Sequence, residues 1–416
     1  MRLCPASCSR CRWPASGEGD HGGAGRSRPP GCLACSRCAR FKGMLRAIIG
    51  PLFPRIPHIM FTRLAFITLS FLWGSSVQAQ IGVSSPPVLR PASVTCTDMA
   101  ARKQVPCPDS ELFFHEGQAP VQSALNARNF AELDALYDRW CVGKDRFPDG
   151  RWKLSQYEAA LSGNFNAWGA WAKDLEVITA WQKSAPRSAA ARFAEAVYWH
   201  AYAWKARGEG YASSVSKEGW ELFRERLAKA DAAMAKFPKM MECAAPHALR
   251  LNLLTGQGAT EAQFLKAYEE AASKFPEYHS IHFAMAQHYE PKWGGSAAQY
   301  EAFADRVAAR TKGFEGMGMY ARLYWIVDTR QGQPFTNSPT QPPSWRKLKA
   351  GYQDLMRLYP SSMHNLGKFA GVACRSREGE LYRKLRTAIA GHQETADMLD
   401  PVDVCDRRHG WVESKG

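Results

Sequence analysis

The sequence lacks most of the signals that identify membrane-spanning, β-rich or well-known catalytic proteins. Its apolar run at 64–73 is ten residues long, whereas a helix needs about 20 residues to cross a bilayer. Alternating Val, Ile and Thr residues and Asn-Gly turns, which predict hairpins, are almost absent. The chain also has no His-Glu-x-x-His, Gly-x-x-x-x-Gly-Lys or Gly-x-Ser-x-Gly motif. These absences leave a helical protein for which no cofactor, metal or catalytic residue is predicted.

The short apolar run belongs to a segment, 60–79, that has the three parts of a secretory signal peptide. Arg63 supplies the positive region, residues 64–73 form the apolar region, and Gly74 breaks the helix before small residues up to Ala79. No cysteine directly follows this site, so a lipid anchor is not expected. The segment predicts cleavage near Ala79, a periplasmic or secreted protein, and no membrane span after cleavage.

Residues 1–59 are interpreted as a gene-model extension, with translation starting at Met60 or at Met44. Cys32-x-x-Cys35-x-x-Cys38 resembles part of an iron–sulfur or zinc ligand run, but no helical or strand period surrounds it. A secretory signal also works poorly when it starts 60 residues into a chain. The alternatives are a genuine metal-binding leader and a cleaved or disordered extension.

Residues 1–79, the extension and the signal peptide together, carry most of the excess positive charge. The whole chain has a net charge of +15, and residues 1–79 hold 11 of its 54 basic residues and two of its 39 acidic residues. The remaining part therefore carries only +6, with basic and acidic residues interleaved along helices. That pattern is typical of a solvated surface rather than of a nucleic-acid-binding protein.

Six cysteines remain after the signal: Cys96, Cys107, Cys141, Cys243, Cys374 and Cys405. An even number in an oxidising compartment indicates disulfides, although spacing alone allows 15 pairings. Cys96 with Cys107 is favoured because it would staple the Pro-rich segment, and Cys374 with Cys405 because it would tie the tail to the last helices. The other two lie within helical patterns and are interpreted as small buried residues.

The exported part is predicted to be an all-α stack of antiparallel helix pairs, a tetratricopeptide-like α-solenoid. Residues 80–120 are rich in Pro, Ser and Thr without a sustained period, and are expected to form an extended arm. A helical-repeat domain is expected over 121–312. C-terminal helices and a tail over 313–416 are expected to continue the stack.

Repeated helix ends support this fold. Amphipathic segments end at Phe237-Pro238, Phe275-Pro276 and Tyr359-Pro360, where an aromatic residue is followed by a helix-stopping proline. Pro186 fits the same scheme. The three prolines after aromatic residues are separated by 38 and 84 positions, close to one and two periods of about 42, which is typical of helix-pair repeats.

Helix starts and buried faces can be located from the same patterns. Four tetrapeptides have a capping-box layout, beginning at Asn129, Ser155, Thr260 and Ser296. The spacing of Trp168, Trp171, Leu175 and Ile178 predicts one apolar stripe on a single helix. The stripe is interpreted mainly as core packing, with a ligand groove as the alternative.

Two groups of polar residues are candidates for sites. His279 and His288 would lie on opposite sides of one helix, so one ion cannot bind both of them together with His282, and no metal site is predicted. His279 and His282 are expected to lie on the polar or lightly buried face of that helix. Glu195 lies in an otherwise apolar helix, where burial raises the pKa of a carboxyl group. Pairing with Arg192 or Arg207 is the more ordinary interpretation of Glu195.

Two aromatic loops are the best candidates for binding. One follows the helix that carries Trp199, Trp204 and Arg207 and continues to Tyr211; the other holds Trp293 between Pro291 and two glycines. Rigid loops with aromatic and Arg side chains are common recognition surfaces. Packed corners are the plainer alternative.

The segments Ala203-Trp204-x-Ala206-Arg207-Gly208, Trp220-x-x-Phe223-x-Glu225-Arg226-Leu227-x-x-Ala230 and Pro291-Lys292-Trp293-Gly294-Gly295-Ser296 carry a family resemblance. They resemble the bacterial domain-of-unknown-function 4034 family, similar to tetratricopeptide-type repeat proteins, over roughly 126–310. The Pro-Lys-Trp-Gly-Gly-Ser stretch is the most specific part. The resemblance implies a helical-repeat fold and no established activity or catalytic residue.

The function predicted from the sequence is a non-catalytic protein- or peptide-binding scaffold of the cell envelope, because stacked helix pairs present a curved surface to partners. The alternative is a periplasmic hydrolase or lyase with a groove around Glu195, Arg207 and Trp293. A pocket that joins these three residues would favour the enzyme.

Overall fold

A computed structural model describes residues 95–98, 103–208, 210–331, 343–390, 398 and 401–412. The leader and the signal peptide predicted at 1–79 lie outside these residues. The predicted all-α class is confirmed, since helices make up nearly all of the described secondary structure. Among the described residues, no helix combines the length and apolar character needed to cross a membrane.

One short hairpin precedes the helices. Strands β1 (Thr95–Asp98) and β2 (Lys103–Pro106) pair antiparallel, and a disulfide joins Cys96 to Cys107. Next come α1 (Asp109–Leu112), a π-helical turn, η1 (Phe113–Gln118), and α2 (Ala119–Asn126). The hairpin and the short helices differ from the extended arm predicted over 80–120. Strands of four residues are too short to show an alternating pattern in the sequence.

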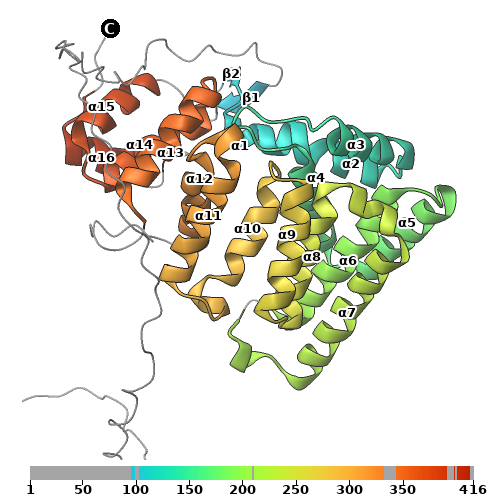
Figure 1. Cartoon of the computed structure of the whole chain (residues 1–416). Helices are drawn as coiled ribbons and strands as arrows, with labels where there is room; N and C mark the ends of the chain where they lie inside the picture. Colours follow the sequence, from blue (N-terminus) through green and yellow to red (C-terminus); the bar gives the residue numbers. More distant parts are fainter. Residues whose placement is uncertain are drawn as a thin grey trace, which may run out of the picture. The chain divides into compact units, whose positions relative to one another are not determined.

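The remaining helices follow one another along the chain: α3 (Phe130–Val142), α4 (Leu154–Trp168), α5 (Trp171–Ser184), α6 (Ala189–Arg207), α7 (Lys217–Lys236), α8 (Ala244–Gln257), α9 (Glu261–Lys274), α10 (His279–His288), α11 (Ala297–Glu315), α12 (Gly318–Gln331), α13 (Trp345–Leu358), α14 (Met363–Arg375), α15 (Gly379–Ala388) and α16 (Val402–His409). Helices adjacent in the sequence pack together, as α6 does with α7, α8 with α9, α11 with α12 and α14 with α15 (Figure 1). Short 3-10 turns η2 (Ala212–Ser214), η3 (Pro238–Glu242) and η4 (Pro291–Trp293) interrupt the order.

The helix ends predicted from the proline pattern are confirmed. Ala185, Phe237, Phe275 and Tyr359 each follow the last residue of a helix, with φ between −128° and −134° and ψ between 60° and 73°. A proline bars its preceding residue from the helical region, so the four helices end in the same way. A repeated local sequence therefore produces a repeated turn between helices.

Three of the four predicted caps are present, and one is wrong. Asn129, Thr260 and Ser296 accept hydrogen bonds from the backbone three residues on, and Thr260 forms the full capping box. Ser155 is not a cap, because α4 begins at Leu154 and the hydroxyl of Ser155 donates to the carbonyl of Trp152.

The predicted stripe from Trp168 to Ile178 is also wrong as a feature of one helix. Helix α4 ends at Trp168, and α5 begins at Trp171. Gly169 lies between them with φ +60°, a left-handed conformation that glycine adopts without a Cβ clash. Trp171 and Ile178 are nevertheless buried on α5, so core packing explains those two residues.

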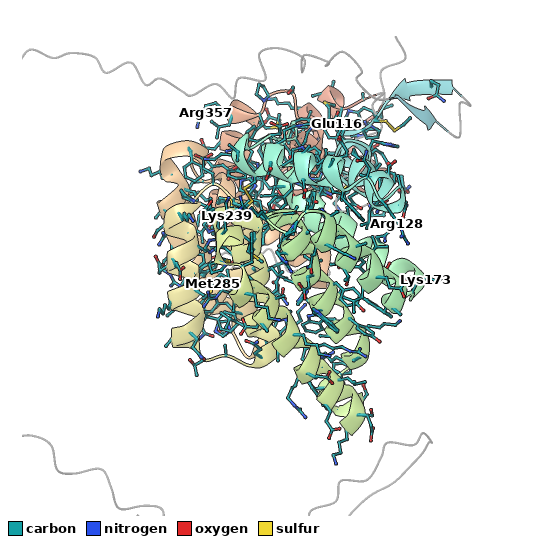
Figure 2. All side chains as sticks on the ribbon, turned by 90° about the vertical axis from the view of Figure 1, so that its right-hand side faces the viewer. Glu116, Arg128, Lys173, Lys239, Met285 and Arg357 are labelled. Carbon is teal, nitrogen blue, oxygen red and sulfur yellow. A yellow bond between two sulfur atoms is a disulfide. The ribbon has the colours of Figure 1, made fainter. Side chains whose placement is uncertain are left out.

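The side chains fill the space between neighbouring helices, while charged ones such as Arg128 and Lys173 lie exposed (Figure 2). Disulfides join Cys374 to Cys405 and Cys141 to Cys243. Cys141 and Cys243 were expected to be two small buried residues, but they form a disulfide that connects the end of α3 to the residue preceding α8. The two partners are 102 positions apart, too far for local spacing to indicate their pairing.

Candidate functional site

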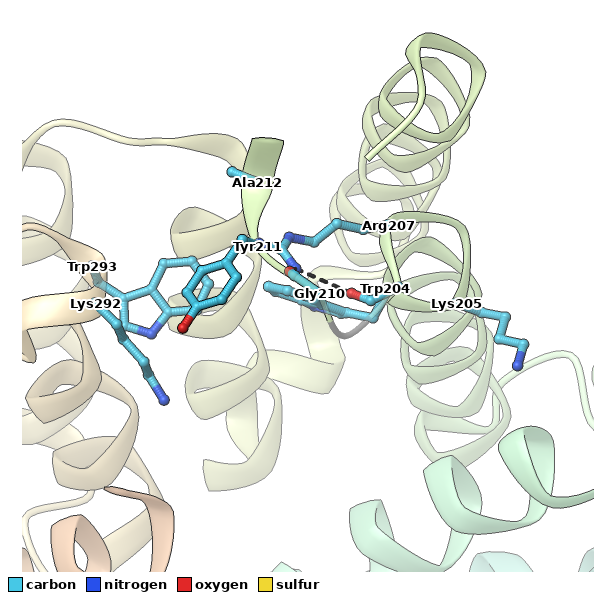
Figure 3. A pocket seen from close by; sticks show the side chains of 9 residues that line it. Trp204, Lys205, Arg207, Gly210, Tyr211, Ala212, Lys292 and Trp293 are labelled. Atoms are coloured by element: carbon cyan, nitrogen blue, oxygen red, sulfur yellow. Dashed lines mark hydrogen bonds between the residues drawn. The ribbon is translucent and has the colours of Figure 1, made fainter. Parts of the chain in front are cut away.

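An open pocket of about 1290 Å³ lies where the end of α6 meets η4. The residues that line it are Trp204, Lys205, Arg207, Gly208, Gly210, Tyr211, Ala212, Lys292 and Trp293. The structure therefore brings together four of the five residues predicted for binding. Segments nearly 90 positions apart in the chain form the two sides of this Trp204–Trp293 pocket (Figure 3).

Trp204 is held in place by its own helix and by neighbouring rings. Its indole N–H donates to Nε2 of His200, one turn earlier, at 2.9 Å. Burial lowers the pKa of His200 to about 4, so the imidazole is neutral and its Nε2 can accept this bond. The indole ring meets Phe223 and Trp293 edge-on, with centroid distances of 5.1 and 5.9 Å. Trp204 thus presents a fixed ring to the pocket.

Arg207 fixes the loop that leaves α6. Its Nη1 donates to the carbonyls of Gly208 and Gly210 at 3.0 and 2.9 Å. The guanidinium also lies over the ring of Trp204, 5.5 Å from its centroid, a cation–π arrangement. In Figure 3 Arg207 points to the loop, whereas Lys205 extends away from the pocket. The fixed guanidinium supplies positive charge at the rim.

The Pro-Lys-Trp-Gly-Gly-Ser stretch positions Trp293. Gly294 has φ +92°, and a Cβ at Gly295 would lie 2.2 Å from the carbonyl oxygen of Tyr289, so both positions favour glycine. The indole Nε1 of Trp293 is buried without a hydrogen-bond partner in the described protein. Lys292 lies 3.2 Å from the buried carboxylate of Glu290, which anchors the turn. These contacts hold a partly exposed indole opposite Trp204.

Tyr211 is the most exposed aromatic residue of the pocket, at 86%. Figure 3 shows its ring in front of Trp293 at the pocket mouth. An exposed aromatic ring beside two fixed indoles gives the pocket an apolar surface that solvent reaches.

Trp199 and Glu195 lie elsewhere on α6. Trp199 packs against Tyr202, and the ammonium group of Lys229 lies 4.5 Å from its ring centroid. Glu195 accepts a hydrogen bond from Gln182 at 2.7 Å and lies 3.9 Å from Arg192. Arg207 follows Glu195 by twelve positions, which is about 18 Å along the helix. The pocket that forms does not join Glu195 to Arg207 and Trp293.

The histidines of α10 are more deeply buried than their sequence pattern indicates. His279 and His282 are only 4% and 0% exposed, so the predicted polar or lightly buried face is wrong. His282 donates from Nε2 to the carbonyl of Pro276 at 2.8 Å and accepts at Nδ1 from the hydroxyl of Tyr268 at 3.0 Å. His288 instead stacks on Phe264. Partners on other elements, which local periodicity does not reveal, determine these positions.

A buried ionic network, which the sequence patterns do not indicate, connects α11, α12 and the loop after α3. Arg322 on α12 contacts Glu315 at the end of α11 and the backbone carbonyl of Asp149 in the loop after α3. Nε2 of His279 lies 3.2 Å from Oε2 of Glu315, and Arg151 pairs with Asp149. No local motif marks these residues, because the network joins positions up to 173 apart in the chain.

One group of three residues in the described part of the chain lies close enough to ligate a metal: Cys96, Cys107 and His115. The two cysteines are joined in a disulfide and therefore offer no thiolate. This group gives no support for a metal centre.

Residues 118–257 match the model of a family described as a domain of unknown function (DUF4034). The match runs from the end of η1 to the last residue of α8, and it includes Trp204, Arg207 and Tyr211. It ends before the Pro-Lys-Trp-Gly-Gly-Ser stretch, so it does not include the segment expected to be most specific. Neither a curated protein nor a solved structure matches the chain.

Proposed function

We propose that this chain is an exported helical protein of the cell envelope that binds a protein or peptide partner at the Trp204–Trp293 pocket without catalysing a reaction. The observation that carries the proposal is the placement of two indoles, 5.9 Å apart, beside the fixed guanidinium of Arg207 and the exposed ring of Tyr211. Trp, Tyr and Arg are the residue types that dominate binding energy at protein interfaces.

The pocket chemistry indicates what the partner offers. An apolar or aromatic side chain would pack on Trp204 and Trp293, and a carboxylate or backbone carbonyl would meet Arg207. Because intramolecular contacts already hold these side chains, little rotamer entropy is lost on binding. The partner is therefore expected to be a segment with an aromatic or aliphatic anchor and an adjacent acceptor.

The hydrolase or lyase alternative has less support. The described residues that line the pocket include Lys and Tyr but no Asp, Glu, His, Ser or Cys, so no carboxylate or imidazole is present there to act as a general base. Glu195, the carboxylate that this alternative requires, is hydrogen-bonded to Gln182 on α5. The pocket is better suited to recognition than to proton transfer.

Site-specific photocrosslinking tests the proposal. A photoreactive phenylalanine analogue at Tyr211 is expected to capture a partner in cells that produce the protein, and Trp293→Ala should remove that product. Val142, which is 79% exposed, provides the control position. The same products from both positions, products that persist in Trp293→Ala, or copurification of only a small molecule would contradict the proposal.

Export is a separate part of the proposal, supported by the signal-peptide pattern at 60–79. The mature protein should begin near Gln80. N-terminal sequencing of protein recovered from the periplasm or medium measures this directly, and tryptic peptides that contain Cys4 to Cys38 would contradict it.

A further inference from the structure

A second cavity, of about 160 Å³, lies where the loop after α3 meets α10 and α12. Its lining residues are Arg151, Trp152, Ser155, Gln156, Tyr278, His279, Ser280, Phe283 and Ile326. No residue lines both this cavity and the Trp204–Trp293 pocket. The two sites can therefore be tested independently.

Four of these lining residues carry a buried polar atom: Nη2 of Arg151, Nε1 of Trp152, Nδ1 of His279 and the hydroxyl of Tyr278. The described protein provides no hydrogen-bond partner for the first three, whereas the hydroxyl of Tyr278 interacts with the side chain of Ser280. Trp152, Tyr278 and His279 are 2%, 1% and 4% exposed. A buried polar atom without a partner is destabilising, so such atoms require groups from outside the chain. Their concentration around one cavity indicates a site rather than scattered packing defects.

Other polar groups of the cavity are already occupied. The hydroxyl of Ser155 donates to the carbonyl of Trp152 at 2.8 Å, and the amide oxygen of Gln156 accepts from Gln118 at 2.8 Å. The atoms that lack partners therefore determine what chemistry the cavity can recognise.

Three of the four atoms can donate. The indole N–H of Trp152 and the guanidinium Nη2 of Arg151 are donors only, and the hydroxyl of Tyr278 can donate as well. Nε2 of His279 lies 3.2 Å from the carboxylate of Glu315, which places the proton of a neutral imidazole on Nε2 and leaves Nδ1 as an acceptor. The cavity is thus suited to a ligand with several acceptor oxygens and one donor.

The charge around the cavity and its volume limit the kinds of ligand that it can bind. The ammonium group of Lys144 and the guanidinium of Arg146 lie 5.4 and 5.5 Å from the ring centroid of Trp152. Arg146 pairs with Glu277 and Arg151 with Asp149, so Lys144 adds the positive charge beside this wall of the cavity. The volume corresponds to about five water molecules at roughly 30 Å³ each. Phe283 and Ile326 supply apolar wall for a short carbon chain.

We propose that this cavity binds a small hydroxycarboxylate. Its carboxylate accepts from Trp152, Arg151 and Tyr278, and its hydroxyl donates to Nδ1 of His279. The proposal does not depend on the partner-binding function of the first pocket.

Titration of the purified full chain with lactate, followed by isothermal calorimetry or saturation-transfer NMR, tests the proposal. Lactate should bind at one site per chain, and more tightly than propionate, which lacks the hydroxyl, or lactamide, which lacks the charge. Trp152→Phe should weaken lactate binding about tenfold, the loss expected for one hydrogen bond to a charged group. Tyr278→Phe should also weaken it, because this change removes the hydroxyl that donates to the carboxylate and leaves the ring in place.

Trp293→Phe is the matched control, because it removes another buried indole N–H without a partner, but in the first pocket. Lactate affinity should be unchanged in that variant. The proposal is overturned if lactate does not bind, since water molecules would then be the groups that occupy the cavity. It is also overturned if lactamide binds as tightly as lactate, or if the folded Trp152→Phe and Tyr278→Phe variants bind lactate like the unaltered protein.

Discussion

Arg322 donates from Nε to Oε1 of Glu315 at 3.0 Å, and its Nη2 lies 2.9 Å from the same oxygen. The two side chains are only 3% and 0% exposed. Burial alone would raise the pKa of Glu315, but the charge of Arg322 and the contact with His279 outweigh it and lower the pKa to about 2. The pair joins the end of α11 to α12 and reaches the loop of Asp149, so it connects three parts of the fold.

Glu315→Gln should therefore destabilise the protein strongly. The change leaves the buried guanidinium of Arg322 without its main counter-charge, and breaking such a buried pair costs about 3–5 kcal/mol. Urea unfolding followed by circular dichroism measures the change in the free energy of unfolding. Glu380→Gln, which removes an exposed ion pair with Lys384 on α15, is the control and should leave the midpoint unchanged within error. Equal midpoints for the two variants would show that the buried pair is not structural.

Stability should also fall between pH 6.5 and pH 4 because of His282. Burial lowers the pKa of His282 to about 4 in the folded protein, whereas the unfolded value is about 6.5. Within this window the unfolded chain binds a proton that the folded chain does not. The stabilisation is fully present above pH 6.5, falls as the pH drops, and changes by about 3 kcal/mol for this group over the window.

His282→Gln tests this assignment. The free energy of unfolding of the variant should depend less steeply on pH between 6.5 and 4, by about one proton. Its stability at pH 7 should be lower than that of the unaltered protein, because Tyr268 and Pro276 lose their hydrogen-bond partner. Unfolding curves at half-unit pH intervals give both slopes. Parallel slopes for the two proteins would rule out His282 as the titrating group.

Features that depend on a single helical turn could be predicted from the sequence. The aromatic-proline ends at Phe237, Phe275 and Tyr359 were predicted because a proline restricts the residue that precedes it. The stripe from Trp168 failed for a related reason: at Gly169 the chain adopts a left-handed conformation that side-chain periodicity does not reveal.

Features that depend on distant partners could not be predicted. Trp204 and Trp293 were each identified as candidates from their own loops, but their ring contact needs the packing of elements far apart in the chain. The burial of His279 depends on its contact with Glu315, 36 positions later in the chain. The burial of Arg322 likewise depends on its contact with Asp149. Charged residues in helical patterns resemble surface residues until such partners are known.

The two glycines of the Pro-Lys-Trp-Gly-Gly-Ser stretch should respond differently to alanine. In Gly295→Ala the new Cβ would overlap the backbone of Tyr289, which cannot move aside as a side chain could, so the cost should be about 3 kcal/mol or more. Gly294→Ala has open space around its Cβ and meets only the penalty of its positive φ, about 1–2 kcal/mol. Thermal unfolding of the two variants gives the comparison. If Gly294→Ala is the less stable of the two, the described geometry of this turn is wrong.

The disulfide between Cys141 and Cys243 should stabilise the fold more than the one between Cys96 and Cys107. It closes a loop of 102 positions rather than 11, and chain-entropy arguments give about 5 against about 3 kcal/mol. The double variant Cys141→Ser/Cys243→Ser should therefore have the lower urea midpoint, with Cys96→Ser/Cys107→Ser as its control. Peptide mapping of non-reduced protein from the oxidising compartment should recover both pairs joined. Recovery of Cys141 and Cys243 as free thiols would contradict this pairing, and with it the expectation that the chain folds where disulfides persist.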